Sequence, residues 1–199
     1  MAARARLKAA LNAKVLPNLI SGARLALMPG VLLAALEGSR LWFAVLMGVC
    51  LLTDMLDGFL ARRLNAYSDF GRRLDSAADY VTLITGVMGI AVLWPEIMRR
   101  ELPWVAVGMC AFFAVLVFGF ARFGRPLGYH TWLTKILALA MALSIIPLLA
   151  EWTATPFRVL VGLQLVASAE QIAIALLLPQ HTGEVQTVWH ALKMRSGKR

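Results

Sequence analysis

Residues 54–79 read DMLDGFLARRLNAYSDFGRRLDSAAD and contain every aspartate of the 199-residue chain. Apolar segments lie on both sides of this stretch and continue into it. A charged side chain within a membrane-spanning segment costs about 2.5–3.5 kcal/mol on insertion scales, and such residues usually mark functional sites. The stretch therefore predicts a polar site that is built into the ends of two membrane helices.

The composition around this stretch is that of an integral membrane protein. Hydrophobic residues make up 60% of the chain, whereas soluble domains contain about 45–50%. The apolar runs are continuous and lack the alternation of a membrane β-strand. We therefore expect an all-α integral membrane protein, a bundle of six transmembrane helices. The expected spans are 16–36, 41–61, 77–95, 103–121, 131–150 and 156–178.

The chain divides into three parts by composition. Residues 1–14 are basic and free of acids, and we expect them to form an amphipathic helix at the membrane surface. The apolar segment that follows is longer than the roughly 7–15 residues of a cleavable signal sequence, so it is expected to stay as the first span. Residues 15–180 then form the six-span membrane domain, and residues 181–199 form a basic tail.

The basic residues indicate the orientation. With six spans, the side that carries both termini and the aspartate-rich stretch also carries most of the lysines and arginines. By the positive-inside rule, both termini and the aspartates face the cytoplasm. This distribution accounts for the net charge of +9 without a nucleic-acid partner. The prediction is a multi-pass protein of the cytoplasmic (inner) membrane.

Four of the aspartates have the spacing of a shared site. Asp54 and Asp57 are three residues apart, and Asp75 and Asp79 are four apart, so each pair lies on one helix face. Two antiparallel helices joined by a short link can direct all four carboxylates at one another. A divalent cation would offset their repulsion, and oxygen ligands favour Mg²⁺, Mn²⁺ or Ca²⁺ over zinc. The alternative is a purely structural set of ion pairs with Arg62, Arg63, Arg72 and Arg73.

The residues beside these carboxylates favour phosphate chemistry. Carboxylates, a divalent cation and flanking arginines are used together to hold phosphates and to transfer a phosphoryl group. Gly58, Ala61 and Gly71 have small side chains that let a phosphate approach the backbone. A transporter would instead distribute polar groups along a path through the bundle, whereas here they cluster at one end. An inactive lipid-binding protein would be expected to lack a ligand, and all four aspartates are present.

The stretch matches every fixed position of D-x2-D-G-x2-A-R-x8-G-x3-D-x3-D. This pattern resembles the signature of the CDP-alcohol phosphotransferase (CDP-alcohol phosphatidyltransferase) family. The segment LPNLISGARLAL at 16–27 is similar to that family as well, and the resemblance extends over roughly residues 10–178.

The resemblance implies an integral-membrane enzyme, usually a homodimer, which moves a phosphoryl-alcohol group from a CDP-alcohol to an acceptor hydroxyl and releases CMP. It implies that Asp54, Asp57, Asp75 and Asp79 bind Mg²⁺ or Mn²⁺, as a pair of ions, and that Asp79 is the general base. The residues that it places around CDP are Asp57, Gly58, Ala61, Arg62, Ser68, Gly71 and Asp75.

The resemblance favours CDP-diacylglycerol as the donor and leaves the acceptor open. Residues 75–80 read DSAADY; phosphatidylglycerophosphate synthases commonly have D-P-x-A-D-K, and the serine branch has D-S-x-A-D. Glycerol 3-phosphate is the first choice because it is the most widespread acceptor. Serine, inositol phosphate or choline, and a CDP-choline or CDP-ethanolamine donor, are the alternatives.

Cationic side chains could bind a phosphorylated acceptor. The candidates are Arg72 within the signature stretch, and Arg122, Arg125, Lys135 and Arg24 outside it. Lys135 and Arg24 each lie a turn or two inside a span, so a side chain that extends to the interface explains them equally well. We expect His130 to lie at the surface and Glu170 to hydrogen-bond within the bundle.

Overall fold

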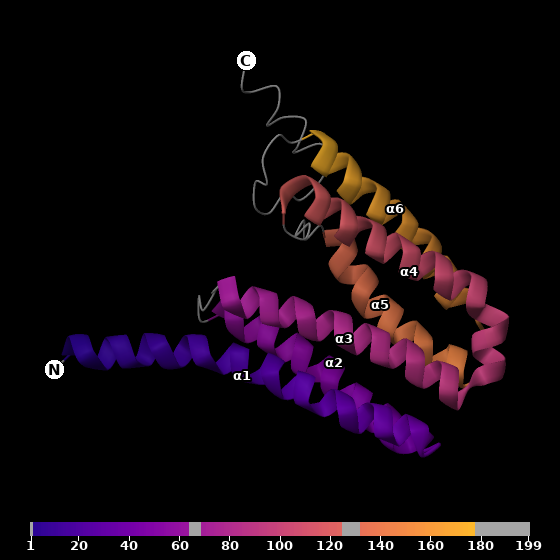
Figure 1. Cartoon of the computed structure of the whole chain (residues 1–199), viewed down its shortest axis with the longest axis horizontal. Coiled ribbons are helices and arrows are strands. Elements are labelled where there is room, and N and C mark those ends of the chain that lie inside the picture. The colour runs from indigo at the N-terminus through magenta and orange to yellow at the C-terminus, as the bar shows by residue number, and fades with distance from the viewer. Residues whose placement is uncertain (1, 64–68, 125–131, 178–199) are drawn as a thin grey trace. The chain divides into compact units, whose positions relative to one another are not determined.

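The described part of the protein is entirely helical. The structure is a computed structural model that describes residues 2–63, 69–124 and 132–177. Side chains are described there except at 2–17, 55, 57–63, 69, 72 and 132–135. The helices are α1 (Ala2–Leu36), α2 (Arg40–Arg63), α3 (Asp69–Leu93), α4 (Pro95–Phe123), α5 (Trp132–Leu149) and α6 (Thr155–Leu177) (Figure 1). The predicted all-α class is confirmed.

Within the described residues, four helical segments are long and apolar enough to cross a membrane: Asn18–Leu36, Arg73–Leu93, Pro95–Phe123 and Thr155–Leu177. A shorter apolar helix covers Ile136–Leu149. Many large apolar side chains on these helices are exposed, as a lipid-facing surface requires. The chain is therefore a multi-pass membrane protein, while the count of six spans and the cytoplasmic position of the termini stay predictions.

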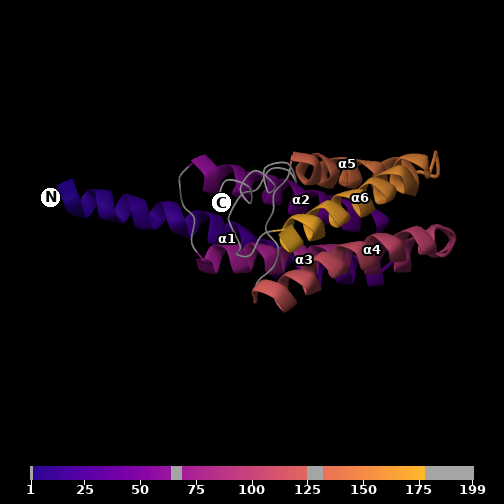
Figure 2. The same ribbon diagram turned by 90° about the horizontal axis from the view of Figure 1, so that it is seen from above.

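The chain forms two units, Met1–Pro95 and Glu96–Arg199. In the first unit, α1 packs along both α2 and α3. The N-terminal part of α1 continues beyond the ends of these two helices, as both views show (Figures 1 and 2). No break separates the predicted surface segment from the first span, since α1 is one helix from Ala2 to Leu36.

The turn after α1 reverses the chain. Gly38 has a φ of 75°, which a glycine adopts without steric cost. The N–H of Ser39 donates to Ala34 O at 2.9 Å, and the N–H of Gly38 donates to Ala35 O at 3.1 Å. These two bonds form a Schellman motif that satisfies the last carbonyls of α1. As a result α2 starts at Arg40 and returns along α1.

The first unit has an apolar core between its three helices. Its buried apolar residues are Met28, Val31, Ala34, Ala35, Phe43, Cys50 and Leu93. Phe43 of α2 packs so closely on α3 that a Cβ on Gly89 would lie 2.1 Å from its ring. Arg40 donates to Leu93 O at 3.0 Å, and its guanidinium lies 5.0 Å from the ring centroid of Trp94. These contacts join α2 to α3 near the end of α3, while both helices pack along α1.

The second unit has a buried ion pair. Glu101 of α4 is 1% exposed and accepts hydrogen bonds from Arg158 Nε and Nη2 of α6, both at 2.8 Å, and from Arg100 Nε at 3.0 Å. We expected Glu101 to precede a span that begins at residue 103. Instead α4 begins at Pro95, because proline suits the first helical position and Glu96 suits the first turn. The helix thus begins before the expected start of the span at residue 103, and the residue at which it enters the membrane stays a prediction.

Candidate active site

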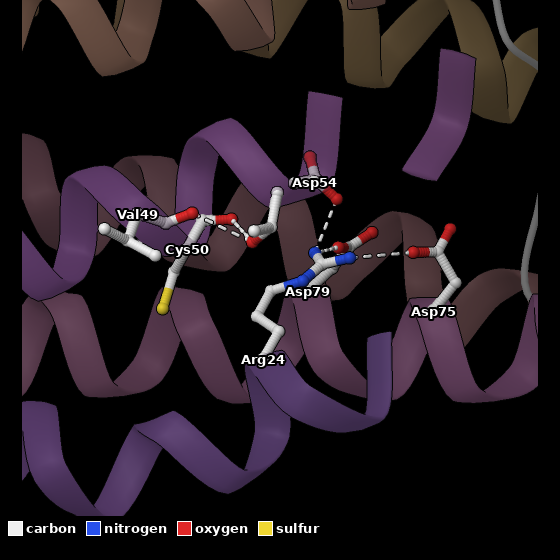
Figure 3. A network of polar contacts seen from close by, with 7 residues as sticks. Arg24, Val49, Cys50, Asp54, Asp75 and Asp79 are labelled. Atoms are coloured by element: carbon white, nitrogen blue, oxygen red, sulfur yellow. Dashed lines mark hydrogen bonds and ion pairs between the residues drawn. The ribbon is translucent and has the colours of Figure 1, made fainter. Parts of the chain in front are cut away.

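Three carboxylates from two helices converge at one end of the first unit. Asp54 lies on α2, and Asp75 and Asp79 lie one turn apart on α3 (Figure 3). One oxygen from each carboxylate lies within 4.8 Å of the others. The convergence that the spacing predicted is confirmed for these three residues. Asp57 is on α2, and its side chain lies outside the described part.

Arg24 of α1 lies between the three carboxylates. Its Nη1 is 2.5 Å from Asp54 Oδ1 and 2.7 Å from Asp79 Oδ1, and its Nη2 is 3.1 Å from Asp75 Oδ1. Figure 3 shows the guanidinium directed at all three aspartates. A third helix therefore contributes to the site, and it does so with a cation.

The two sides of this cluster differ in their access to solvent. The side chain of Arg24 is 1% exposed, whereas those of Asp54, Asp75 and Asp79 are 43%, 45% and 48% exposed. The guanidinium thus lies on the buried side, and the carboxylates are open on the other side. A ligand that reaches the cluster approaches the carboxylates first.

Charge explains why an arginine belongs here. Two unit charges about 4.8 Å apart repel by about 3.5 kcal/mol at an effective dielectric constant of about 20. For three carboxylates, the three pairs together amount to on the order of 10 kcal/mol before screening. Arg24 lies within hydrogen-bond distance of all three, so its attraction offsets this repulsion. Three carboxylates at −1 and one guanidinium at +1 sum to −2, the charge that one divalent cation balances.

The hydroxyl group of Thr53, next to Asp54, is hydrogen-bonded within its own helix. The Thr53 hydroxyl donates to the carbonyl oxygens of Val49 and Cys50 within its own helix, at 2.9 Å each. Hydroxyl groups in membrane helices commonly bond back in this way.

The interpretation of Arg24 as a side chain that extends to the interface is wrong, because its guanidinium is buried. A signal for this is present in the sequence. Ser21, Arg24, Met28, Val31 and Ala35 follow a three-four spacing, and all five are buried on the face of α1 that packs into the unit. An arginine on such a face requires acidic partners.

The other predicted site residues are not tested by the structure. Gly58, Ala61, Arg62 and Arg72 lie on α2 and α3, and Lys135 lies on α5, but their side chains are outside the described part. Ser68, Arg125 and His130 lie outside the described residues altogether. Gly71 is in the first turn of α3. Arg122 lies in the last turn of α4 in the second unit, and its guanidinium lies 5.6 Å from the ring centroid of Phe123.

Comparison with known proteins indicates the family of the chain. The sequence model of the CDP-alcohol phosphatidyltransferase family matches residues 14–178. The cardiolipin synthase (CMP-forming) of Streptomyces coelicolor is 35% identical over 117 residues, which cover 56% of this chain and 54% of that protein. The CDP-diacylglycerol–glycerol-3-phosphate 3-phosphatidyltransferase of Aquifex aeolicus is 46% identical over 65 residues, which cover 33% of this chain and 36% of that protein.

The phosphatidylinositol phosphate synthase of Corynebacterium glutamicum is 32% identical over 101 residues, which cover 50% of this chain and 45% of that protein. The chain thus spans about half or less of the length of these curated relatives. No solved structure matches it. Because the family model covers most of the sequence, including the converging Asp54, Asp75 and Asp79, the chain belongs to the CDP-alcohol phosphatidyltransferase family.

Proposed function

We propose that this enzyme transfers the phosphatidyl group of CDP-diacylglycerol to the hydroxyl of glycerol 3-phosphate and releases CMP. The observation that carries the proposal is the convergence of Asp54, Asp75 and Asp79, at the spacing of the family signature, on the open side of the first unit. Enzymes of this family use a divalent metal, and an acidic cluster is present here.

The carboxylates have the chemistry of a Mg²⁺ or Mn²⁺ site. Two oxygens that share one Mg²⁺ lie at most about 4.2 Å apart, because each is about 2.1 Å from the ion. The oxygens of Asp54, Asp75 and Asp79 lie within 4.8 Å of one another, so small rotations of the half-exposed side chains suffice. Asp57 would complete the set, and with four carboxylates we propose two ions. Bound metal would neutralise pyrophosphate oxygens of the donor.

The reaction breaks the bond between the phosphatidyl phosphorus and the oxygen that bridges to CMP. A new bond forms from that phosphorus to the acceptor oxygen, and CMP leaves with the bridging oxygen. We assign Asp79 as the base that takes the acceptor proton, as the family signature implies, and its half-exposed carboxylate can be reached by an acceptor hydroxyl. Gly58, Ala61, Arg62, Ser68 and Gly71, together with Asp57 and Asp75, would bind the CDP moiety.

The names of several relatives support glycerol 3-phosphate as acceptor. Two of the similar proteins, from Aquifex aeolicus and Rickettsia bellii, are named CDP-diacylglycerol–glycerol-3-phosphate 3-phosphatidyltransferases. Cationic side chains would then bind the acceptor phosphate, and the candidates are Arg72, Arg122, Arg125 and Lys135. Serine and inositol phosphate stay as alternatives, since relatives that carry these names match as well.

A second acceptor class is favoured by the Streptomyces coelicolor relative. This protein is a cardiolipin synthase that forms CMP, and its match covers more of the chain than the Aquifex aeolicus match does. Making cardiolipin from a CDP-activated lipid requires a phospholipid that itself carries the hydroxyl. Phosphatidylglycerol is therefore the second candidate acceptor.

We further propose that the enzyme is a homodimer of the cytoplasmic (inner) membrane with six spans and a site that faces the cytoplasm. The bacterial relatives and the apolar helices support the membrane location. Clustering of basic residues on the side of the termini and the signature supports the orientation.

CMP release tests the proposal. Purified protein in detergent is supplied with CDP-diacylglycerol and Mg²⁺, and glycerol 3-phosphate, phosphatidylglycerol, serine and inositol phosphate are added one at a time. We expect release that depends on glycerol 3-phosphate and stops on chelation of the metal. Release with phosphatidylglycerol alone would establish the second candidate. Release with none of the acceptors by a protein that binds the donor would contradict the assignment of both.

A further inference from the structure

We propose that Arg24 is a positioning residue, which gathers the carboxylates of Asp54, Asp75 and Asp79 from the buried side and so preforms the divalent-cation site on their exposed side. The inference rests on the proposed function only in that these carboxylates bind a divalent cation. It assigns a role to α1, which lies outside the signature stretch at 54–79.

Arg24 bridges carboxylates of two different helices. Its two terminal nitrogens reach one oxygen, Oδ1, of each of three carboxylates, at 2.5, 2.7 and 3.1 Å. The guanidinium is planar and rigid, so it imposes a geometry on its partners that the single ammonium of a lysine does not impose. The positions of Asp54 on α2 and of Asp75 and Asp79 on α3 are thereby coupled through α1.

Burial makes this bridge a fixed part of the fold. Arg24 is 2% exposed and lies on the same face of α1 as Met28 and Val31, which belong to the apolar core. Withdrawing the guanidinium would leave a cation in an apolar environment and three carboxylates without this partner. An ion that approaches from the exposed side therefore meets carboxylates that the Arg24 guanidinium holds in position from the buried side.

Two opposite effects on metal affinity follow from Arg24. Its positive charge repels a cation, whereas its contacts remove the cost of bringing three like charges together. The second effect is the larger, since Arg24 is in direct contact with all three carboxylates and an ion on the exposed side lies beyond them. Removal of a group that orients metal ligands typically costs about 10–100-fold in metal affinity. We therefore expect Arg24 to strengthen cation binding despite its charge.

The test is Mn²⁺ binding by the full chain in detergent, followed by the electron paramagnetic resonance signal of free Mn²⁺. Arg24→Met should raise the dissociation constant at least about tenfold. Arg24→Lys keeps the charge and loses the planar fork, so it should raise the constant by a smaller factor. Arg158→Met is the control, because it removes an arginine from another carboxylate ion pair, that with Glu101, in the other unit. It should lower the thermal midpoint and leave Mn²⁺ affinity unchanged.

Any other result of the Mn²⁺ binding test would overturn the proposal. Unchanged Mn²⁺ affinity in Arg24→Met would reduce Arg24 to a structural ion pair. Tighter binding would mean that Arg24 competes with the metal. If Arg24→Met does not fold, Arg24→Lys decides, and wild-type affinity in that variant would refute positioning by the guanidinium. Absence of Mn²⁺ binding by the wild type would refute the metal site itself, and with it the proposed function.

Discussion

Replacing Gly89 with alanine should destabilise the first unit, because α2 and α3 meet at this position without room for a side chain. A Cβ built on Gly89 lies 2.1 Å from Phe43 Cε2 and 2.6 Å from Cζ. Carbon atoms in contact are about 3.5–4.0 Å apart, so the ring must move by more than 1 Å or the helices must separate. Phe43 is 4% exposed and its ring centroid lies 6.2 Å from that of Trp94, so the ring has little space to turn.

Two opposing effects determine how much Gly89→Ala changes the free energy of unfolding. Overpacking of a well-packed core costs about 1–3 kcal/mol. Alanine in place of glycine within a helix stabilises it by about 1 kcal/mol. The net expectation for Gly89→Ala is a loss of up to about 2 kcal/mol, and a loss of about 1 kcal/mol lowers the thermal midpoint by about 2–4 °C in a chain of this size.

The assay is thermal unfolding in detergent, and the chain offers a control and a rescue. Gly48→Ala places its Cβ in open space on α2, so only the favourable helix term remains and the midpoint should rise. Phe43→Leu should recover part of the loss in the Gly89→Ala background, since the two residues are in contact. A Gly89→Ala midpoint equal to that of Gly48→Ala would refute the close approach of α2 and α3 at Gly89.

Three further changes test other parts of the structure. Asp79→Asn should retain CDP-diacylglycerol binding and lose CMP release, and near wild-type turnover in this variant would remove Asp79 from the base role. Glu101→Gln should lower the thermal midpoint because Arg158 loses a charged partner, while Mn²⁺ affinity stays as in the wild type; a loss of Mn²⁺ affinity would show that this ion pair influences the metal site. Gly38→Ala should destabilise by about 1–2 kcal/mol, since a φ of 75° is costly for any residue with a Cβ, and an unchanged midpoint would contradict the turn after α1.

The helices and the grouping of the aspartates could be predicted because both depend on local spacing. Apolar runs of sufficient length indicate membrane helices whatever they pack against. Asp75 and Asp79 share a helix face because they are four residues apart, and the short link after α2 brings Asp54 near them. The burial of Glu101 could not be predicted, because its partner Arg158 is 57 residues away in the sequence and only such pairing lets a carboxylate lie inside an apolar helix.

What the sequence by itself determined is the helical class, the membrane location and the carboxylate cluster, together with the family that these residues indicate. Only the tertiary structure decided what the carboxylates contact: Arg24 is 30 residues from Asp54, 51 from Asp75 and 55 from Asp79. Such pairs depend on which faces of α1, α2 and α3 meet, and here α1 packs along both of the other helices. An isolated helical pattern shows which face is buried, whereas the partner of a buried charge is established by helix packing.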